Sequence, residues 1–181
     1  MTTVEKVQNY LLLEIDQAFQ PQVEDWILAI TEHIERVTQR KFTADEQFQE
    51  KKYDGTGKLT QYVGDFIEME KVEVDGNEIT ALTYPANTLP KFKLYSENGF
   101  SQGKQNVVVS AKWGFSEEPP LDIVHATTVL VAGVVQANQQ GGGKIIKEKL
   151  GNYDVAYSTE KEFSDYKRAL DILASYRRYS I

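Results

Sequence analysis

The spacing of apolar residues changes twice along this chain of 181 residues, and this change is the strongest constraint on the fold. Over residues 2–40, apolar residues recur every three or four positions, as on one face of a helix. Over residues 45–115, they alternate with polar residues in short runs, as in strands with one exposed face. Helical spacing then returns. The pattern predicts an α+β fold, mainly a bundle of four helices with a small antiparallel β-sheet section inserted into it.

The first two helices are predicted to form an antiparallel hairpin over residues 2–40. Thr2 and Glu5 have the spacing of a capping box, which marks a helix start. Pro21 suits the first turn of the second helix, because the fixed backbone angle of proline fits that position. The apolar residues of the second helix form one seam, which is expected to face the core. They are Val23, Ile27, Ile30, Ile34 and Val37.

Turn dipeptides divide the β section. Asp54-Gly55, Asp75-Gly76 and Asn98-Gly99 favour tight turns, because these residues tolerate positive φ. Asp75-Gly76 is predicted to join the two strands of a hairpin. Residues 98–104 are predicted to form the loop before the last strand of the section.

The last two helices are predicted over residues 120–140 and 159–178. The first is apolar on nearly all sides, which is typical of a central helix covered by its neighbours. A triple glycine at 141–143 ends it, and a short segment with alternating residues at 153–157 follows. We expect these helices, the hairpin and the β section to form a single domain over residues 1–181.

Composition excludes several classes of function. The chain has no cysteine and two histidines, so thiol catalysis, disulfides and cysteine-based zinc sites are ruled out. Its net charge of −7 disfavours sequence-specific DNA binding and attraction to anionic membranes. The first residues lack the pattern of a signal peptide, and the sequence leads us to expect no membrane partner.

Catalytic motifs are also missing from the sequence. Gly57-Lys58 and Gly143-Lys144 lack the earlier glycine and the following Ser or Thr of a phosphate-binding loop. His33 and His125 have no second histidine at a chelating spacing. We therefore expect no catalytic residues, no cofactor, no metal and no enzymatic activity.

Several short strings occur in an order that covers most of the chain. They lie at residues 34–42, 53–55, 72–76, 107–115, 119–123 and 148–153. With this layout, the chain resembles the head-tail connector proteins of tailed bacteriophages and prophages, also called adaptor or head-completion proteins. The β section is longer than in the smaller members of that family.

The resemblance implies a structural subunit of the virion neck. Such subunits form a homo-oligomeric ring, here expected to be a dodecamer, beneath the portal protein. The ring extends the DNA channel and provides the platform for tail attachment. The implied partners are other copies of the chain, the portal, a stopper or tail-completion protein, and genomic DNA that passes through the lumen without sequence-specific contacts. Assembly is expected in the cytoplasm of the bacterial host.

The last helix and its tail are the predicted site of portal docking, because they combine aromatic, basic and aliphatic residues. The candidates are Phe163, Tyr166, Tyr176, Arg177, Arg178, Tyr179 and Ile181. In the alternative interpretation, the two tyrosines near the end close the helical bundle and the two arginines bind carbonyls at the helix end. The second predicted site is a loop that faces the channel or a neighbouring subunit. It consists of Gly141, Gly142, Gly143 and Lys144.

Other functions remain open from the sequence. The first is a different neck or tail-completion protein of similar size and acidity. The second is a small-molecule or peptide-binding module that uses aromatic residues of the sheet, and the third is an unrecognised hydrolase. The aromatic candidates for the second are Tyr53, Tyr62, Phe66, Tyr84, Phe92 and Tyr95.

Overall fold

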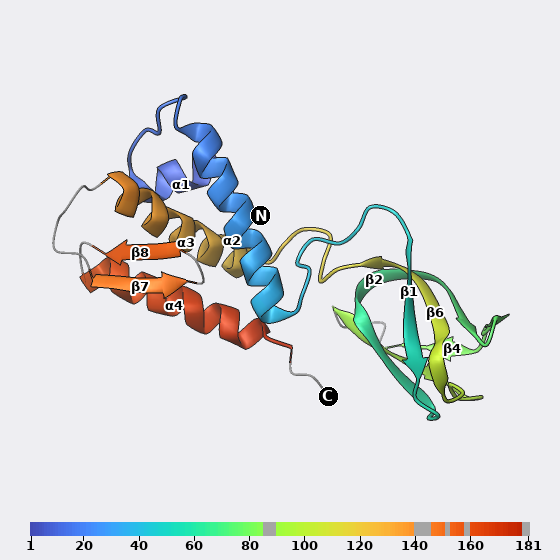
Figure 1. The fold of residues 1–181 in the computed structure, drawn as a ribbon. Helices are drawn as coiled ribbons and strands as arrows, with labels where there is room; N and C mark the ends of the chain where they lie inside the picture. The colour runs from blue at the N-terminus through green and yellow to red at the C-terminus, as the bar shows by residue number, and fades with distance from the viewer. Residues whose placement is uncertain (85–89, 140–145, 151–152, 158–159, 179–181) are drawn as a thin grey trace. The chain divides into compact units, whose positions relative to one another are not determined.

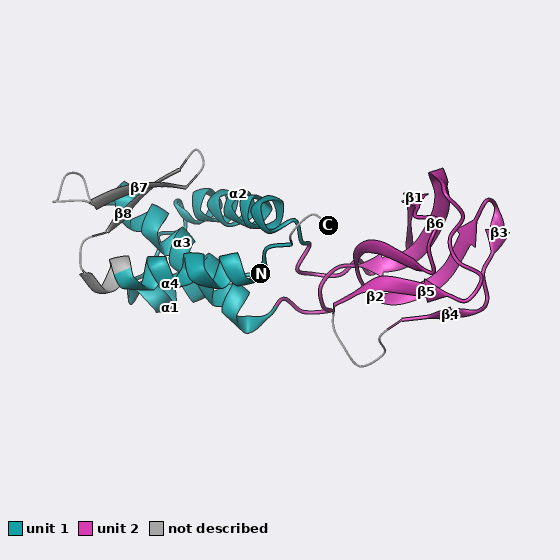
Figure 2. Ribbon diagram, turned by 90° about the horizontal axis from the view of Figure 1, so that it is seen from below, with its two compact units in different colours: residues 1–40, 120–181 teal, residues 41–119 magenta. Residues whose placement is uncertain are grey.

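The structure is a computed structural model that describes residues 1–84, 90–139, 146–150, 153–157 and 160–178. Its contacts divide the chain into two compact units (Figure 2). The helical unit comprises residues 1–40 and 120–181, and the β unit comprises residues 41–119. The β unit is therefore an insertion between two segments of the helical unit, as the change in periodicity predicts.

Over its described residues, the helical unit contains four helices, one of them central (Figure 1). They are α1 (Val4–Leu11), α2 (Gln20–Thr38), α3 (Leu121–Gln139) and α4 (Glu160–Tyr176). The other three helices all pack against α3, which buries residues on every side. The prediction of a central helix is confirmed.

Two threonines in α3 keep the helical conformation despite their preference for strands. The hydroxyls of Thr127 and Thr128 donate hydrogen bonds of 2.8 Å to the carbonyls of Ile123 and Val124, one turn earlier. Their polar groups are thus satisfied inside an apolar helix. By length and composition alone α3 could cross a membrane, but 67% of its most apolar window is buried within the protein. A core helix meets the same criterion.

The start of α1 corrects one prediction. The N-cap is Thr3, whose side chain accepts a hydrogen bond from the amide of Lys6. Thr2 is instead buried, and its Oγ1 lies 2.6 Å from Oγ1 of Thr128 on α3. The helix cap lies one residue later than predicted, because the hydroxyl of Thr2 is hydrogen-bonded to Thr128 in the core.

The predicted seam of α2 is confirmed for most of its length. Val23, Ile30 and Ile34 are buried, but Val37 is 45% exposed and Thr38 takes its place in the core. Thr38 can be buried because its hydroxyl donates to the carbonyl of Ile34, 2.7 Å away. The predicted hairpin of α1 and α2 is a loose one, because each helix contacts α3 more than it contacts the other.

A two-stranded antiparallel sheet completes the helical unit. It pairs β7 (Ile146–Leu150) with β8 (Tyr153–Tyr157), and β8 packs against α3. The predicted alternation at 153–157 corresponds to β8, whereas the sequence analysis did not predict β7.

Outside residues 85–89, the β unit forms a sheet of six strands, and every ladder described in it is antiparallel. The strands are β1 (Gln49–Gly55), β2 (Thr60–Val74), β3 (Asn77–Glu78), β4 (Leu82–Thr83), β5 (Lys91–Ser96) and β6 (Gly103–Trp113). The order is β1-β6-β2-β5-β4, and β3 pairs with the end of β2. The hairpin at Asp75-Gly76 is confirmed, with both residues at positive φ.

The long strand β2 belongs to two ladders. Its first half pairs with β5 and its second half with β6, with irregular register near Phe66. The strand therefore curves the sheet around an apolar core of its own. The largest side chains in that core are Trp113, Phe66 and Phe100, each no more than 1% exposed.

These observations change one expectation about the architecture. The fold is α+β, but the description as mainly a helical bundle is not supported, because the inserted sheet is a compact unit with a separate core. Within the predicted single domain, the contacts thus distinguish two compact units.

Candidate interaction surfaces

The C-terminal end of α4 is fastened to two other helices of its unit. The phenol of Tyr176 donates to the carboxylate of Asp122 at the start of α3, with an O–O distance of 3.0 Å. The carbonyl of Tyr176 accepts a hydrogen bond of 2.6 Å from Nε of Arg40. After the helix, the amide of Arg178 donates to the carbonyl of Thr38, 2.9 Å away. Partial burial and the hydrogen bond to Asp122 raise the pKa of Tyr176.

These contacts bear on the predicted docking residues. The ring of Tyr176 closes the bundle, as the alternative interpretation predicts. The arginine that binds the carbonyl at the helix end, however, is Arg40. Arg177 is exposed and Arg178 is half-buried. Tyr166 is 2% exposed, so its ring lies in the core.

The remaining predicted residues cannot be placed in the same way. Phe163 belongs to α4, but only its backbone is described. Tyr179 and Ile181 lie outside the described residues. The same holds for the loop of Gly141, Gly142, Gly143 and Lys144.

An apolar groove of about 150 Å³ lies between α2, α3 and α4, beside this end of α4. Its lining includes Val37, Leu170 and Leu173. The other lining residues are His33, Ile34, Thr38, Leu130, Ala174 and Arg177. We call it the α2–α4 groove. Sequence analysis placed Val37 in the core, so it did not predict an opening here.

His33 contributes a neutral group to this groove. Its Nδ1 lies 2.8 Å from a guanidinium nitrogen of Arg36, which can only donate, so the ring nitrogen accepts. Burial and the positive charge of Arg36 lower the pKa of His33. Arg177 is therefore the lining side chain that carries a full charge at neutral pH.

The C-terminal end of α1 presents a protruding leucine. Leu12 caps the C-terminus of α1 in the left-handed conformation, with φ of 54°, and is 92% exposed. The sequence offered one signal for it. Leu11, Leu12 and Leu13 are consecutive, and three consecutive residues of a helix cannot all face one core.

The aromatic residues of the β unit separate into two groups. Phe66 is buried, Tyr84 packs edge-on against it, and Tyr53 packs near Trp113. The second group is on the surface. Tyr62, Phe92 and Tyr95 are each 39% exposed, with Tyr62 and Phe92 stacked and Nζ of Lys93 over both tyrosine rings.

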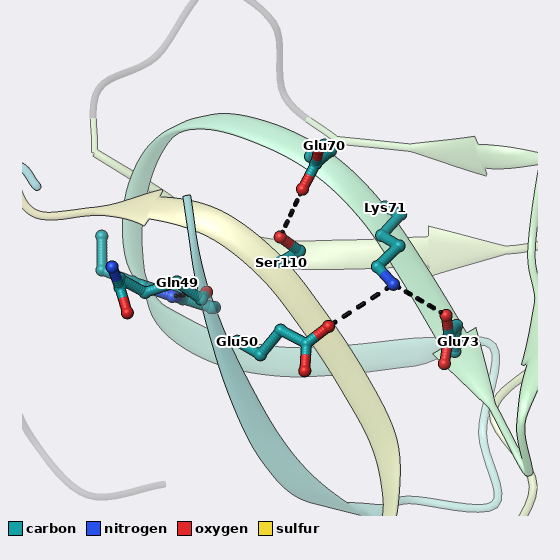
Figure 3. A network of polar contacts seen from close by, with 7 residues as sticks. Gln49, Glu50, Glu70, Lys71, Glu73 and Ser110 are labelled. Atoms are coloured by element: carbon teal, nitrogen blue, oxygen red, sulfur yellow. Dashed lines mark hydrogen bonds and ion pairs between the residues drawn. The ribbon is translucent and has the colours of Figure 1, made fainter. Parts of the chain in front are cut away.

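Figure 3 shows a charged network on one face of the β unit. Nζ of Lys71 on β2 lies 3.0 Å from the carboxylate of Glu73 and 3.4 Å from that of Glu50 on β1. Ser110, on the strand between them, donates to Glu70 at 2.6 Å. The hydrogen bond to Glu73 is the main cause that raises the pKa of Lys71. The network joins three strands and contains neither a histidine nor an activated nucleophile.

Among the residues that the structure describes, no group of three or more His, Cys, Asp or Glu side chains is arranged to hold a metal ion.

Comparisons with known proteins find similarity of fold alone. No family model matches the chain, and no curated protein matches its sequence. Among solved structures, it is similar to a chain in the neck of an empty GTA particle, determined with C6 symmetry. The TM-score is 0.60 at 11% identity, and the match covers 98% of this chain and 90% of that one.

A second match comes from the virion of a native gene transfer agent (GTA) particle. Its TM-score is 0.55 at 11% identity, with the same coverage of both chains. Both matches span the helical unit and the inserted β unit, so the whole layout of this chain recurs in these particles.

Proposed function

We propose that this protein is a structural component of the neck of a phage-like particle. The observation that carries the proposal is the fold shared over 98% of the chain with a chain from the neck of a GTA particle. The resemblance of the sequence to connector proteins of tailed phages points to the same place. A non-enzymatic role in the virion agrees with both.

More specifically, we propose an adaptor that forms a ring under the portal protein. The ring extends the DNA channel and offers the platform on which the stopper or tail-completion protein and the tail assemble. A dodecamer is compatible with the C6 symmetry of the related neck, because twelve copies can obey sixfold symmetry. Assembly would take place in the host cytoplasm before the particle is released.

The charge of the chain supports passage of DNA through such a ring. A strongly basic wall would bind phosphates and release counterions, which would hold the DNA in place. With a net charge of −7, this protein lacks that strong attraction.

Electron microscopy of the purified protein, alone and mixed with its portal protein, tests the proposed function. We expect rings, at least in the presence of the portal. The proposal would be wrong if particles that lack this protein packaged DNA, retained it and joined tails normally.

We place the proposed portal-docking segment at the end of the chain, after Tyr176 and Arg178, whose hydrogen bonds hold the end of α4 in the bundle. Deleting residues 176–181 would remove the hydrogen bonds of Tyr176 and Arg178, and so would damage the bundle. Deleting residues 179–181 spares them. This shorter truncation should keep the circular dichroism spectrum and melting temperature but lose binding to the portal. Normal portal binding by the folded truncation would contradict the docking proposal.

One surface favours a second candidate function, a ligand-binding or peptide-binding module. Tyr62, Phe92, Tyr95 and Lys93 form an exposed aromatic and cationic patch on the β unit. The triple variant Y62A/F92A/Y95A separates the two functions. An adaptor with this variant should still enter necks, whereas a ligand that raises the melting temperature of the natural protein but not of the variant would support a module.

A further inference from the structure

Leu12 is an exposed apolar side chain held on an ordered turn. Its amide donates to the carbonyl of Gln8, which ends α1 in the left-handed conformation. Glycine or asparagine usually occupies such a position, since they adopt positive φ more readily. The following turn is tied by Asp16, whose carbonyl accepts from the amides of Phe19 and Gln20 at 2.8 and 3.1 Å. The fold of the subunit therefore does not explain why a leucine protrudes here.

The surroundings of Leu12 are acidic. It borders a shallow depression that is also lined by Glu5, Gln8, Asn9, Leu13 and Glu14. The two charged residues in this lining are both glutamates, and exposed Asp16 follows in the same turn. We call Leu12 with Glu5 and Glu14 the α1 knob.

The α2–α4 groove has complementary properties. Its volume of about 150 Å³ is that of a cavity for one benzene-sized group, and is smaller than most sites for drug-sized ligands. Its lining is mostly apolar, with the charge of Arg177 at its edge. The groove thus fits one or two aliphatic side chains that carry a carboxylate nearby.

The knob and the groove are separate patches of one subunit, because the knob lies at the end of α1 and the groove lies between α2, α3 and α4. Leu12 precedes α2, whereas Val37 lies in its last turn. A helix of 19 residues is about 28 Å long. Figure 1 shows the connection from α1 entering one end of α2, while the other end lies beside the end of α4. Two different patches on one subunit are the arrangement that a head-to-tail contact between identical subunits requires.

We propose that Leu12 of one copy of this chain inserts into the α2–α4 groove of the next copy. Glu5 and Glu14 then lie near Arg177, and the same contact repeats around the ring. This inference rests on the proposed function, because it assumes a ring of identical subunits. It assigns Arg177 to the subunit interface and leaves residues 179–181 for the portal.

Other exposed leucines fit this contact less well. Leu121 is 84% exposed, but its neighbour Asp122 accepts a hydrogen bond from Tyr176 beside the groove. Leu121 therefore lies on the same side of the unit as the groove itself. Leu28 is 60% exposed and lies in the middle of α2. Leu28 therefore provides a matched control.

Disulfide cross-linking tests the contact without background, because the chain has no cysteine. The double variant L12C/V37C, oxidised in assembled necks and as concentrated purified protein, should give a ladder of multimers on a non-reducing gel. The control L28C/V37C should not. The ladder can arise only between copies, and circular dichroism checks that both variants are folded.

A charge reversal provides a second measurement. Adding Arg177→Glu to L12C/V37C should lower the cross-linking yield by about fivefold at low salt, since the knob is acidic. Adding Glu14→Arg as well should restore it. An unchanged yield in both would contradict the proposed charge pairing.

The outcomes separate this inference from the proposed function. If necks contain the folded double variant but give no ladder, the interface is wrong and the neck assignment stands. In those necks, the thiol introduced at position 37 could be protected from a maleimide without linking to the thiol at position 12. Another neck protein would then fill the groove, and this result would also overturn the inference. Absence of the natural protein from necks would instead overturn the proposed function.

Discussion

At the residue scale, hydrogen bonds between distant positions decide which local signals hold. Thr2 has the sequence of a helix cap, yet its hydroxyl is bonded to Thr128 and Thr3 caps the helix. Val37 has the spacing of a core residue, yet Thr38 is buried in its place. The hydrogen bond of Thr2 depends on a partner far along the chain, which local spacing does not contain, whereas the hydroxyl of Thr38 is satisfied one turn earlier in its own helix.

The ionisation of Asp75 should affect the stability of the fold. It sits at φ of 52° in the β2–β3 turn, and Ser101 and Asn106 donate hydrogen bonds to its carboxylate. The bond from Ser101 is the larger cause that lowers the pKa of Asp75. A depressed pKa means that the ionised form is favoured in the folded state. Its stabilisation is therefore present at neutral pH and is lost as pH falls through the folded-state pKa.

We accordingly expect Asp75→Asn to lower stability at pH 7, with a difference from the natural protein that shrinks steadily below about pH 5. Asparagine tolerates the same backbone conformation, so the variant removes the charge and one of the two acceptor oxygens without straining the turn. Urea unfolding at a series of pH values measures the difference. Ser101→Ala should reproduce part of it, and a difference that is constant with pH would contradict the assignment.

At the scale of elements, local patterns in the sequence predict the four described helices and one hairpin, but not the order of the strands in the sheet. The four helices, the Asp75-Gly76 hairpin and the strand at 153–157 follow from local periodicity and turn residues. The order β1-β6-β2-β5-β4 does not, because it depends on contacts between strands far apart in sequence. The α2–α4 groove was missed for the same reason. It requires knowing which faces of α2 and α4 meet.

The two faces of α2 should differ sharply in their contribution to stability. Ile30 is fully buried, and Leu28, two residues earlier, is 60% exposed. Ile30→Ala should lower the free energy of unfolding by ~2–5 kcal/mol, because it removes packed atoms and leaves a cavity. Leu28→Ala should change it by less than about 0.5 kcal/mol. Chemical denaturation measures both, and similar losses would mean that α2 packs by a different face.

At the scale of the whole molecule, the β unit is inserted so that its two ends meet. Phe115 donates from its amide to the carbonyl of Lys41 at 2.8 Å, and the amide of Ala44 donates to the carbonyl of Ser116 at 2.9 Å. The ring of Phe115 also packs against Phe42. Gly114, the residue before Phe115, approaches Ala44 so closely that a Cβ atom added to the glycine would overlap the backbone of Ala44. The entry and exit of the unit are therefore joined independently of the helices.

We expect residues 41–119 to fold as a separate fragment, since they contain a complete apolar core and paired ends. Trp113 reports on this directly, because it is 1% exposed and its indole donates to the carbonyl of Gln49 at 2.6 Å. Its fluorescence should be that of a buried ring and should shift to longer wavelength in one cooperative transition on heating. Gly114→Ala in the fragment should lower the midpoint, because it forces apart the joined ends. A fragment with exposed tryptophan and no cooperative transition would mean that the sheet needs the helical unit in order to fold.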